Sequence, residues 1–161
     1  MTLFMWHFSK LDLNFKNKIK ICILHFNYKM IEIFFFWIIT GGDIGKWNKV
    51  KPNYFVGVDI AETSVEQAKT RFRERRNNFR ADFFAADCTK TDLDPLFKEY
   101  CEEQNVTFDI VSCQFAFHYC FESVQQADCM LRNISKRLRK GGFFIGTTTD
   151  ANDIGNISFY F

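Results

Sequence analysis

Short apolar runs alternate with amphipathic segments along most of this 161-residue chain. Four of the runs are long enough for buried strands, and two of those end in an acidic residue. They are NYFVGVD (53–59), DFFAAD (82–87), FDIVSCQF (108–115) and GFFIGTTT (142–149). Apolar runs of this kind are typical of strands in a parallel sheet that is covered on both faces.

Three segments between these runs have helical periodicity, at residues 63–77, 93–104 and 123–138. The first follows a capping box, formed by Thr63–Glu66 or by Ser64–Gln67. The third carries basic residues at its end, and we expect Gly141–Gly142 to stop it. Alternating strands and helices predict an α/β fold with a doubly wound parallel sheet.

The composition changes at both ends of the chain. Residues 1–40 contain no Gly, Pro, Ala, Val, Arg or Gln, and residues 155–161 return to the same Phe- and Ile-rich composition. We therefore divide the chain into an atypical segment, 1–40, a domain core, 41–154, and a divergent tail, 155–161. The apolar block MIEIFFFWII (30–39) is shorter than the ~20 residues of a spanning helix, so we expect no membrane partner.

Charge and cysteine usage exclude several classes of protein. The net charge of +2 does not favour a general nucleic-acid surface. The six cysteines have neither C-x-x-C spacing nor a zinc pattern with His118, so we expect free thiols, mostly buried, and no metal.

Acidic residues follow two of the expected strands, at the sheet edge where ligands bind in open α/β folds. Asp59 lies 17 residues after Gly42, a spacing that suits a carboxylate accepting hydrogen bonds from two ribose hydroxyls. The alternative is that Asp59 caps the next helix. Asp87 ends the next strand, and its alternative is a solvated turn.

SCQFAFHYCFES (112–123) places Gln114, His118 and Tyr119 in a loop at the same edge. His118 suits stacking on, or hydrogen bonding to, a base, and Tyr119 suits a cofactor wall. A purely structural alternative places at least two of Phe115, Phe117 and Phe121 in the core.

Two cations suit a polyphosphate. Lys46 follows GGD, and Arg71 lies in the first expected helix. The alternative is that the basic run RFRERR is simply a solvated helix face.

These segments together resemble the eukaryotic-type mRNA cap guanine-N7 methyltransferases, which are class I S-adenosylmethionine-dependent enzymes. GGDIGKW (41–47) resembles the family's GGDLxKW, and VGVDIAETSVEQAKTRF resembles its second strand and following helix. DIVSCQFAFHYCFES and ADCMLRNISKRLRKGGFFIGTT resemble its later core. The resemblance covers about 41–154 and implies a class I methyltransferase (Rossmann-like) sheet, incomplete at both ends.

Carried over by position, the resemblance implies cofactor contacts at Gly41, Asp59, Asp87, Gln114 and Tyr119. It implies contacts with the RNA cap at Lys46, Arg71 and His118. Asp59 would bind the ribose and Asp87 the adenine of S-adenosylmethionine, while the two cations would bind the cap phosphates. No catalytic side chain is implied, because guanine N7 already has a lone pair and proximity and orientation supply the rate.

The chain departs from the family pattern before the glycines. MIEIFFFWIITGGD stands where the family has a strand reading like VLDLGCGKGGD, and Thr40 replaces the family's lysine. Trp37 stands where the family has a glycine, and is expected to obstruct the methionine end of the cofactor. Since the resemblance also stops near Ile154, we expect that 1–40 and 155–161 are not family sequence and that a sheet edge is left exposed.

The resemblance implies transfer of a methyl group to N7 of the mRNA cap, with the capped RNA 5′ end and the capping machinery as partners and the nucleus as location. Three alternatives remain open: an inactive fragment that binds RNA or a partner, another class I methyltransferase acting on small molecules, and a nicotinamide dehydrogenase suggested by the acid spacing alone.

Overall fold

The computed structural model describes residues 2–7, 32–36 and 44–148. Within these ranges, six strands form one sheet in the order β1-β6-β5-β2-β3-β4. The strands are β1 (Thr2–His7), β2 (Glu32–Phe36), β3 (Tyr54–Asp59), β4 (Arg80–Ala85), β5 (Phe108–Cys113) and β6 (Leu138–Thr148). The helices are α2 (Ile44–Val50), α3 (Glu62–Glu74), α4 (Asp94–Tyr100), the 3-10 helix η2 (Phe117–Glu122) and α5 (Val124–Arg137).

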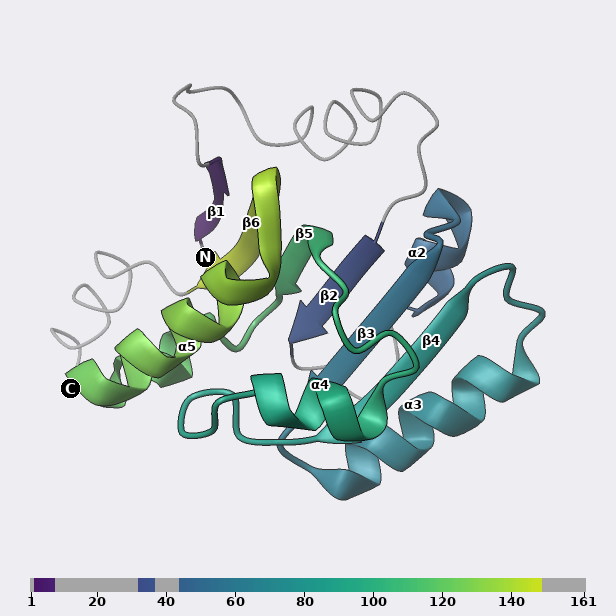
Figure 1. Ribbon diagram of the computed structural model, residues 1–161, viewed down its shortest axis with the longest axis horizontal. Coiled ribbons are helices and arrows are strands. Elements are labelled where there is room, and N and C mark those ends of the chain that lie inside the picture. The colour runs from purple at the N-terminus through teal and green to yellow at the C-terminus, as the bar shows by residue number, and fades with distance from the viewer. Residues whose placement is uncertain (1, 8–31, 37–43, 149–161) are drawn as a thin grey trace, which may run out of the picture.

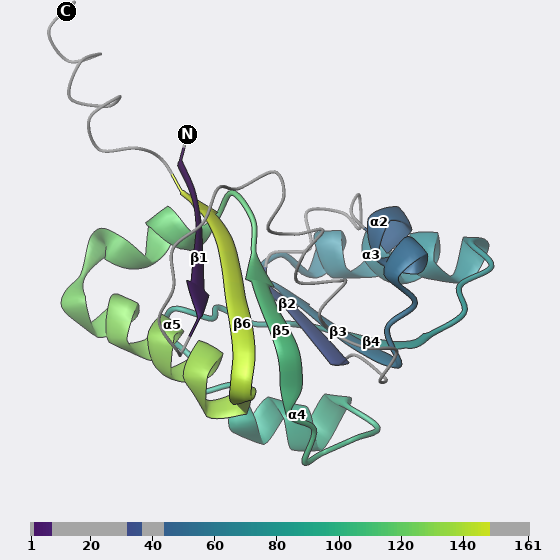
Figure 2. The ribbon, with the colours of Figure 1, turned by 90° about the horizontal axis from the view of Figure 1, so that it is seen from above.

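Helices cover both faces of the sheet, as Figures 1 and 2 show: α2 and α3 lie on one face, and α4 and α5 on the other. Consecutive residues of a strand point to opposite faces. Accordingly Phe55 belongs to the buried cluster under α2 and α3, whereas Val56 belongs to the cluster under α4, α5 and η2. The doubly wound parallel sheet expected from the sequence is confirmed.

Strand β2 comes from the atypical segment and lies in the middle of the sheet (Figure 2). It pairs in parallel with β3 and with β5, and Ile33 is fully buried between Phe55 and Ile110. Its last residue, Phe36, is level with Val58 and Cys113. The apolar block before the glycines therefore aligns the carboxyl ends of the neighbouring strands.

The prediction that a sheet edge is left exposed is wrong for β6. Strand β1 pairs with β6 in antiparallel orientation, from Thr2 opposite Thr148 to His7 opposite Phe143. The unpaired backbone groups that an edge strand would present to solvent are thus covered by the start of the same chain.

Two expected helix boundaries are also wrong. Helix α3 begins at Glu62 with Ala61 as its N-cap and has no side-chain cap, so the Thr63–Glu66 and Ser64–Gln67 boxes lie inside the helix. Instead, the Asp59 carboxylate accepts a hydrogen bond from the Ala61 amide at 2.9 Å.

Gly141–Gly142 do not stop α5, which ends at Arg137, but lie inside β6. Gly141 has a φ of 82°, and the register between β5 and β6 shifts at this point. A Cβ at position 142 would lie 2.9 Å from the Asp109 carbonyl oxygen. The two glycines therefore permit a β-bulge rather than a helix end.

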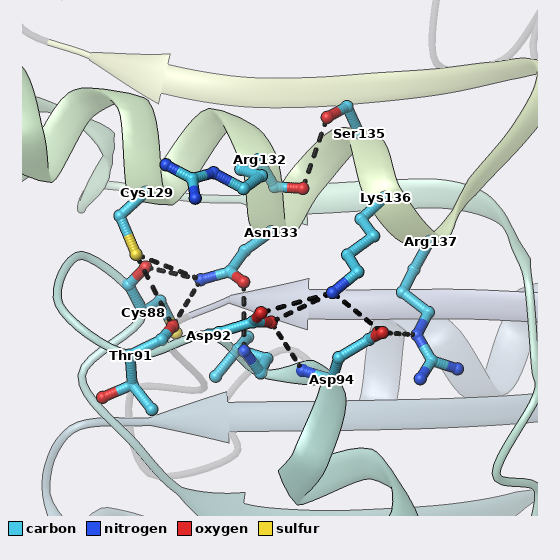
Figure 3. A network of polar contacts seen from close by, with 11 residues as sticks. Cys88, Thr91, Asp92, Asp94, Cys129, Arg132, Asn133, Ser135, Lys136 and Arg137 are labelled. Carbon is cyan, nitrogen blue, oxygen red and sulfur yellow. Dashed lines mark hydrogen bonds and ion pairs between the residues drawn. The ribbon is translucent and has the colours of Figure 1, made fainter.

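Helix α5 holds the loop between β4 and α4 (Figure 3). The buried Asn133 side chain donates to the carbonyls of Cys88 (2.9 Å) and Thr91 (2.7 Å) and accepts from the Leu93 amide (3.1 Å). One turn later, Arg137 Nε donates to Asp94 at 2.7 Å. The three bonds of Asn133 satisfy backbone groups of an irregular loop that would otherwise be buried without partners.

Asn133→Ala removes the three hydrogen bonds to backbone groups of the loop and leaves those buried groups unpaired. We expect it to lower the free energy of unfolding by about 3 kcal/mol, measured by urea denaturation. Ser135→Ala, an exposed change on the same helix, is the control and should stay within about 0.5 kcal/mol of the parent. A small effect at Asn133 would show that the loop does not depend on it.

Because Asp94 titrates, the stability that this network provides depends on pH. Burial favours its neutral form, but hydrogen bonds from Lys136 and Arg137 outweigh that effect and hold its pKa below the ordinary value of 3.8. Because the folded pKa is lower than the unfolded one, the stabilisation is complete above pH ~4 and is lost as the pH falls through the folded pKa.

Asp94→Asn removes this titration, so the fall in stability below pH ~4 should be shallower in the variant than in the parent. Urea midpoints measured between pH 6 and pH 2.5 check the slope. Asp128→Asn, which alters an exposed ion pair on α5, serves as the control. Parallel curves for the parent and Asp94→Asn would contradict the assignment.

Candidate functional site

The predicted acids lie at the carboxyl edge of the sheet. Asp59 is the last residue of β3 and is 3% exposed, and Asp87 follows the end of β4 by two residues. The Ala86 amide donates to the Asp59 carbonyl at 2.9 Å, which ties the two strand ends together. Gln114 follows the end of β5 at the same edge, and its Nε2 donates to Ser112 Oγ at 3.0 Å.

The Asp87 carboxylate is held from one side by the loop that follows it. Its Oδ1 accepts from the Thr89 amide at 2.9 Å and from the Thr89 hydroxyl at 2.7 Å. The Lys90 ammonium lies 3.7 Å from Oδ2. Both bonds to Thr89 go to a single oxygen, so the rotation of the carboxylate is fixed.

A strained turn separates β5 from η2. Phe115 has a φ of 59°, the left-handed region that costs a bulky residue about 1–2 kcal/mol. After this turn Phe117 enters the core, where its ring lies 5.2 Å from that of Phe144, while His118 is half-buried and Tyr119 is exposed. The expectation that at least two of the three phenylalanines are core residues is wrong, since Phe115 and Phe121 are both more than half exposed.

Between η2 and the Asp87 loop lies a cavity of about 460 Å³, a volume within the range of small-molecule sites. Its lining residues come from the loop after β4, from η2 and from the first turn of α5: Asp87, Thr89, Lys90, His118, Tyr119, Phe121, Glu122 and Gln126. The His118 and Tyr119 rings lie 4.2 Å apart. His118 Nδ1 is buried and has no hydrogen-bond partner among the described residues.

The structure brings three of the predicted residues together in this cavity, namely Asp87, His118 and Tyr119. Asp59 and Gln114 lie at the same sheet edge but do not line it. Arg71 is exposed on α3, on the other face of the sheet from α5. Gly41 lies outside the described residues, and so does the side chain of Lys46, whose backbone belongs to α2.

The sequence analysis missed five lining residues: Thr89, Lys90, Phe121, Glu122 and Gln126. For one of them, Gln126, the sequence contains a recognisable helix-capping signal. Ser123 and Gln126 form a capping box at the start of α5, in which the backbone amide of Gln126 donates to Ser123 Oγ at 3.2 Å. That box places the Gln126 side chain beside the cavity.

The described cysteines are free, as expected. Four are buried and Cys129 is half-buried, while Cys22 lies outside the described residues. Burial raises the pKa of Cys101 to about 12 and that of Cys120 to about 11. Among the described residues, no three His, Cys, Asp or Glu side chains are grouped so that they could hold a metal ion. No helix in these ranges has the length and apolarity needed to cross a membrane.

The sequence model for the mRNA (guanine-N(7))-methyltransferase domain matches residues 12–159. The chain belongs to this family. Among curated relatives, mRNA cap guanine-N(7) methyltransferases from Drosophila melanogaster and Schizosaccharomyces pombe are 45% and 42% identical to it. Each alignment covers 71% of this chain but only 28% and 31% of the relative, so the chain spans about a third of their length.

Solved structures place the fold among methyltransferases. An S-adenosylmethionine-dependent methyltransferase from Clostridium acetobutylicum matches with a TM-score of 0.60 at 19% identity, covering 84% of this chain and 50% of that one. The N-methyltransferase NodS from Bradyrhizobium japonicum matches with a TM-score of 0.59 at 13% identity, covering 88% and 72%. The expected class I methyltransferase fold is confirmed. The boundaries at residues 41 and 154 stay predictions.

The burial of the thiols predicts their reactivity. In the folded protein at pH 8 we expect Cys88, Cys101, Cys113 and Cys120 to resist a thiol reagent such as DTNB, because the thiolate is the reactive form. In urea all six cysteines should react. Mass spectrometry of alkylated peptides identifies the sites, and rapid labelling of Cys113 in the folded chain would contradict the described core.

Proposed function

We propose that this chain transfers a methyl group from S-adenosylmethionine to N7 of the guanosine cap at the 5′ end of mRNA. The observation that carries the proposal is the cavity at the carboxyl edge of the sheet. It has a fixed carboxylate, Asp87, on one wall and the His118–Tyr119 ring pair on the other. Family membership supports the same reaction.

The residues at the strand ends fit the methyl donor. Asp59 would bind the ribose hydroxyls and Asp87 the adenine amino group, since ionised carboxylates only accept hydrogen bonds and these ligand groups donate them. Tyr119 lines the cavity and would cover the donor, with Gln114 and Gly41 completing its surroundings. Asp87 is already held by the Thr89 amide and hydroxyl in a position from which it lines the cavity.

The residues proposed for the cap are His118 for the guanine and Lys46 and Arg71 for the phosphates. His118 has an unpartnered Nδ1 among the described residues and lines the same cavity as Asp87. When bound, S-adenosylmethionine would supply a methyl group on a sulfonium: the N7 lone pair would bond to the methyl carbon as the C–S bond breaks, which leaves neutral S-adenosylhomocysteine and a positive charge on the methylated guanine. The protein therefore orients the two ligands and excludes water, and no side chain has to take a proton.

The capped RNA 5′ end and the capping machinery follow as proposed partners, and the nucleus as the proposed location. The names of the curated relatives, mRNA cap guanine-N(7) methyltransferases, support the capped RNA as a partner.

Calorimetric titration with S-adenosylhomocysteine tests the donor site, and transfer of a labelled methyl group to cap-bearing RNA tests the reaction. We expect binding near micromolar, about −8 kcal/mol. Asp87→Ala should weaken it about tenfold by removing a charged acceptor. His118→Ala should lower methyl transfer while leaving donor affinity within about twofold.

Asp128→Ala, an exposed change on α5 away from the cavity lining, is the matched control for both assays. A folded chain that binds the donor product but methylates no capped RNA would contradict the proposed acceptor. A folded chain that does not bind it would contradict the proposed reaction.

A further inference from the structure

Four side chains that line the cavity form a hydrogen-bonded chain ending at Asp87. Thr89 is 7% exposed and its hydroxyl lies 2.7 Å from Asp87 Oδ1. Gln126 Nε2 lies 3.5 Å from the Thr89 hydroxyl oxygen and 2.9 Å from Glu122 Oε2. The chain thus runs from Glu122 through Gln126 and Thr89 to Asp87, and joins η2 to the loop after β4.

The direction of the Gln126 amide is set by two neighbours. Its Nε2 faces the Glu122 carboxylate, which only accepts, and its Oε1 lies 2.9 Å from Ser123 Oγ, which donates to it. The opposite orientation would place the amide oxygen against the Glu122 carboxylate. Gln126 therefore presents an N–H to Thr89.

The Thr89 hydroxyl has one hydrogen, and both of its neighbours direct that hydrogen to the same place. The Asp87 carboxylate only accepts and the N–H of Gln126 only donates, so the hydrogen lies toward Asp87. At 3.5 Å the contact with Gln126 is long for a hydrogen bond, so its contribution is mainly electrostatic orientation. Asp87 Oδ1 then receives two donors from Thr89, and the carboxylate keeps its acceptor role toward the cavity.

We propose that Thr89 and Gln126 are positioning residues that hold Asp87 as a hydrogen-bond acceptor, so that the site selects a purine bearing an exocyclic amino group over one bearing a carbonyl. The inference rests on the proposed function, in which the adenosyl group of the donor faces Asp87. A carbonyl at the same place sets two acceptors against each other and leaves the Asp87 carboxylate without a hydrogen-bond donor from the ligand.

Titration of the full chain with S-adenosylhomocysteine and with S-inosylhomocysteine, which has hypoxanthine in place of adenine, tests this selection. The parent should prefer the adenosyl ligand by more than about tenfold. Thr89→Val keeps the shape of the side chain and removes the hydroxyl. Gln126→Glu keeps the shape and replaces the N–H donor by an acceptor, which draws the Thr89 hydrogen away from Asp87.

Both variants should weaken the adenosyl ligand about tenfold and change the affinity for the inosyl ligand less than about twofold, so that the preference is lost. Thr89→Ser, which retains the hydroxyl, should restore the parent values. Gln125→Glu introduces the same charge at the neighbouring exposed position and should behave like the parent. Thermal unfolding midpoints confirm that each variant is folded.

Equal weakening of both ligands would mean that Thr89 and Gln126 only support the loop, and would overturn the inference. An unchanged preference for the adenosyl ligand in the two variants would also overturn the inference, provided that the parent binds this ligand. If the folded parent binds neither ligand, the proposed function itself fails, and the inference fails with it.

Discussion

Parallel pairing of β2 with both of its neighbours is the constraint on which the rest of the structure depends. Without this strand, β3–β4 and β5–β6 would be two separate parallel pairs, each with buried polar backbone groups left unpaired. Ile33, fully buried, joins the apolar cluster that α2 and α3 cover. The register also brings Phe36 level with Val58 and Cys113, so the residues that follow β3 and β5 emerge at one edge. The position of Asp59 relative to Gln114 is therefore a consequence of backbone pairing, not of any contact between their side chains.

Helix α5 positions the residues of the cavity, as β2 positions the ends of its neighbouring strands. Asn133 binds the loop between β4 and α4, Arg137 binds Asp94 at the start of α4, and the first turn of α5 carries Gln126 to the cavity. Ser123 begins the helix directly after η2, so the rings of His118 and Tyr119 are positioned by the same element that fixes the Asp87 loop. Both walls of the cavity are thus held by one rigid helix, and a ligand between them meets little conformational freedom.

Local pattern predicted the parallel strands β3, β4, β5 and β6, but it did not predict the central parallel strand β2 or the antiparallel partner of β6. The runs at 53–59 and 108–115 contain β3 and β5, because a buried parallel strand is a continuous apolar run whatever its neighbours are. The pairing of β1 with β6 joins Thr2 to Thr148, and no local signal encodes a contact over that separation. Gly141 was misassigned for a related reason, since a left-handed glycine serves a helix end and a β-bulge equally well. In the site, Asp87 and His118 were recognisable by residue type and position. The contact of Thr89 with Gln126 joins positions 37 residues apart, and no local signal encodes it.

The turn at Phe115 shows how the fold supports the exposed rings of η2. The left-handed backbone at this residue costs about 1–2 kcal/mol. Burial of the Phe117 side chain contributes about 2–3 kcal/mol in the opposite direction, with an edge contact to Phe121 and a tilted ring contact to Phe144 in addition. The strain and the burial come from the same short segment, so the turn is stable only while Phe117 is packed. When η2 buries Phe117 in the core, its next two residues point away from the core. The packing of Phe117 is therefore what presents His118 and Tyr119 to the cavity.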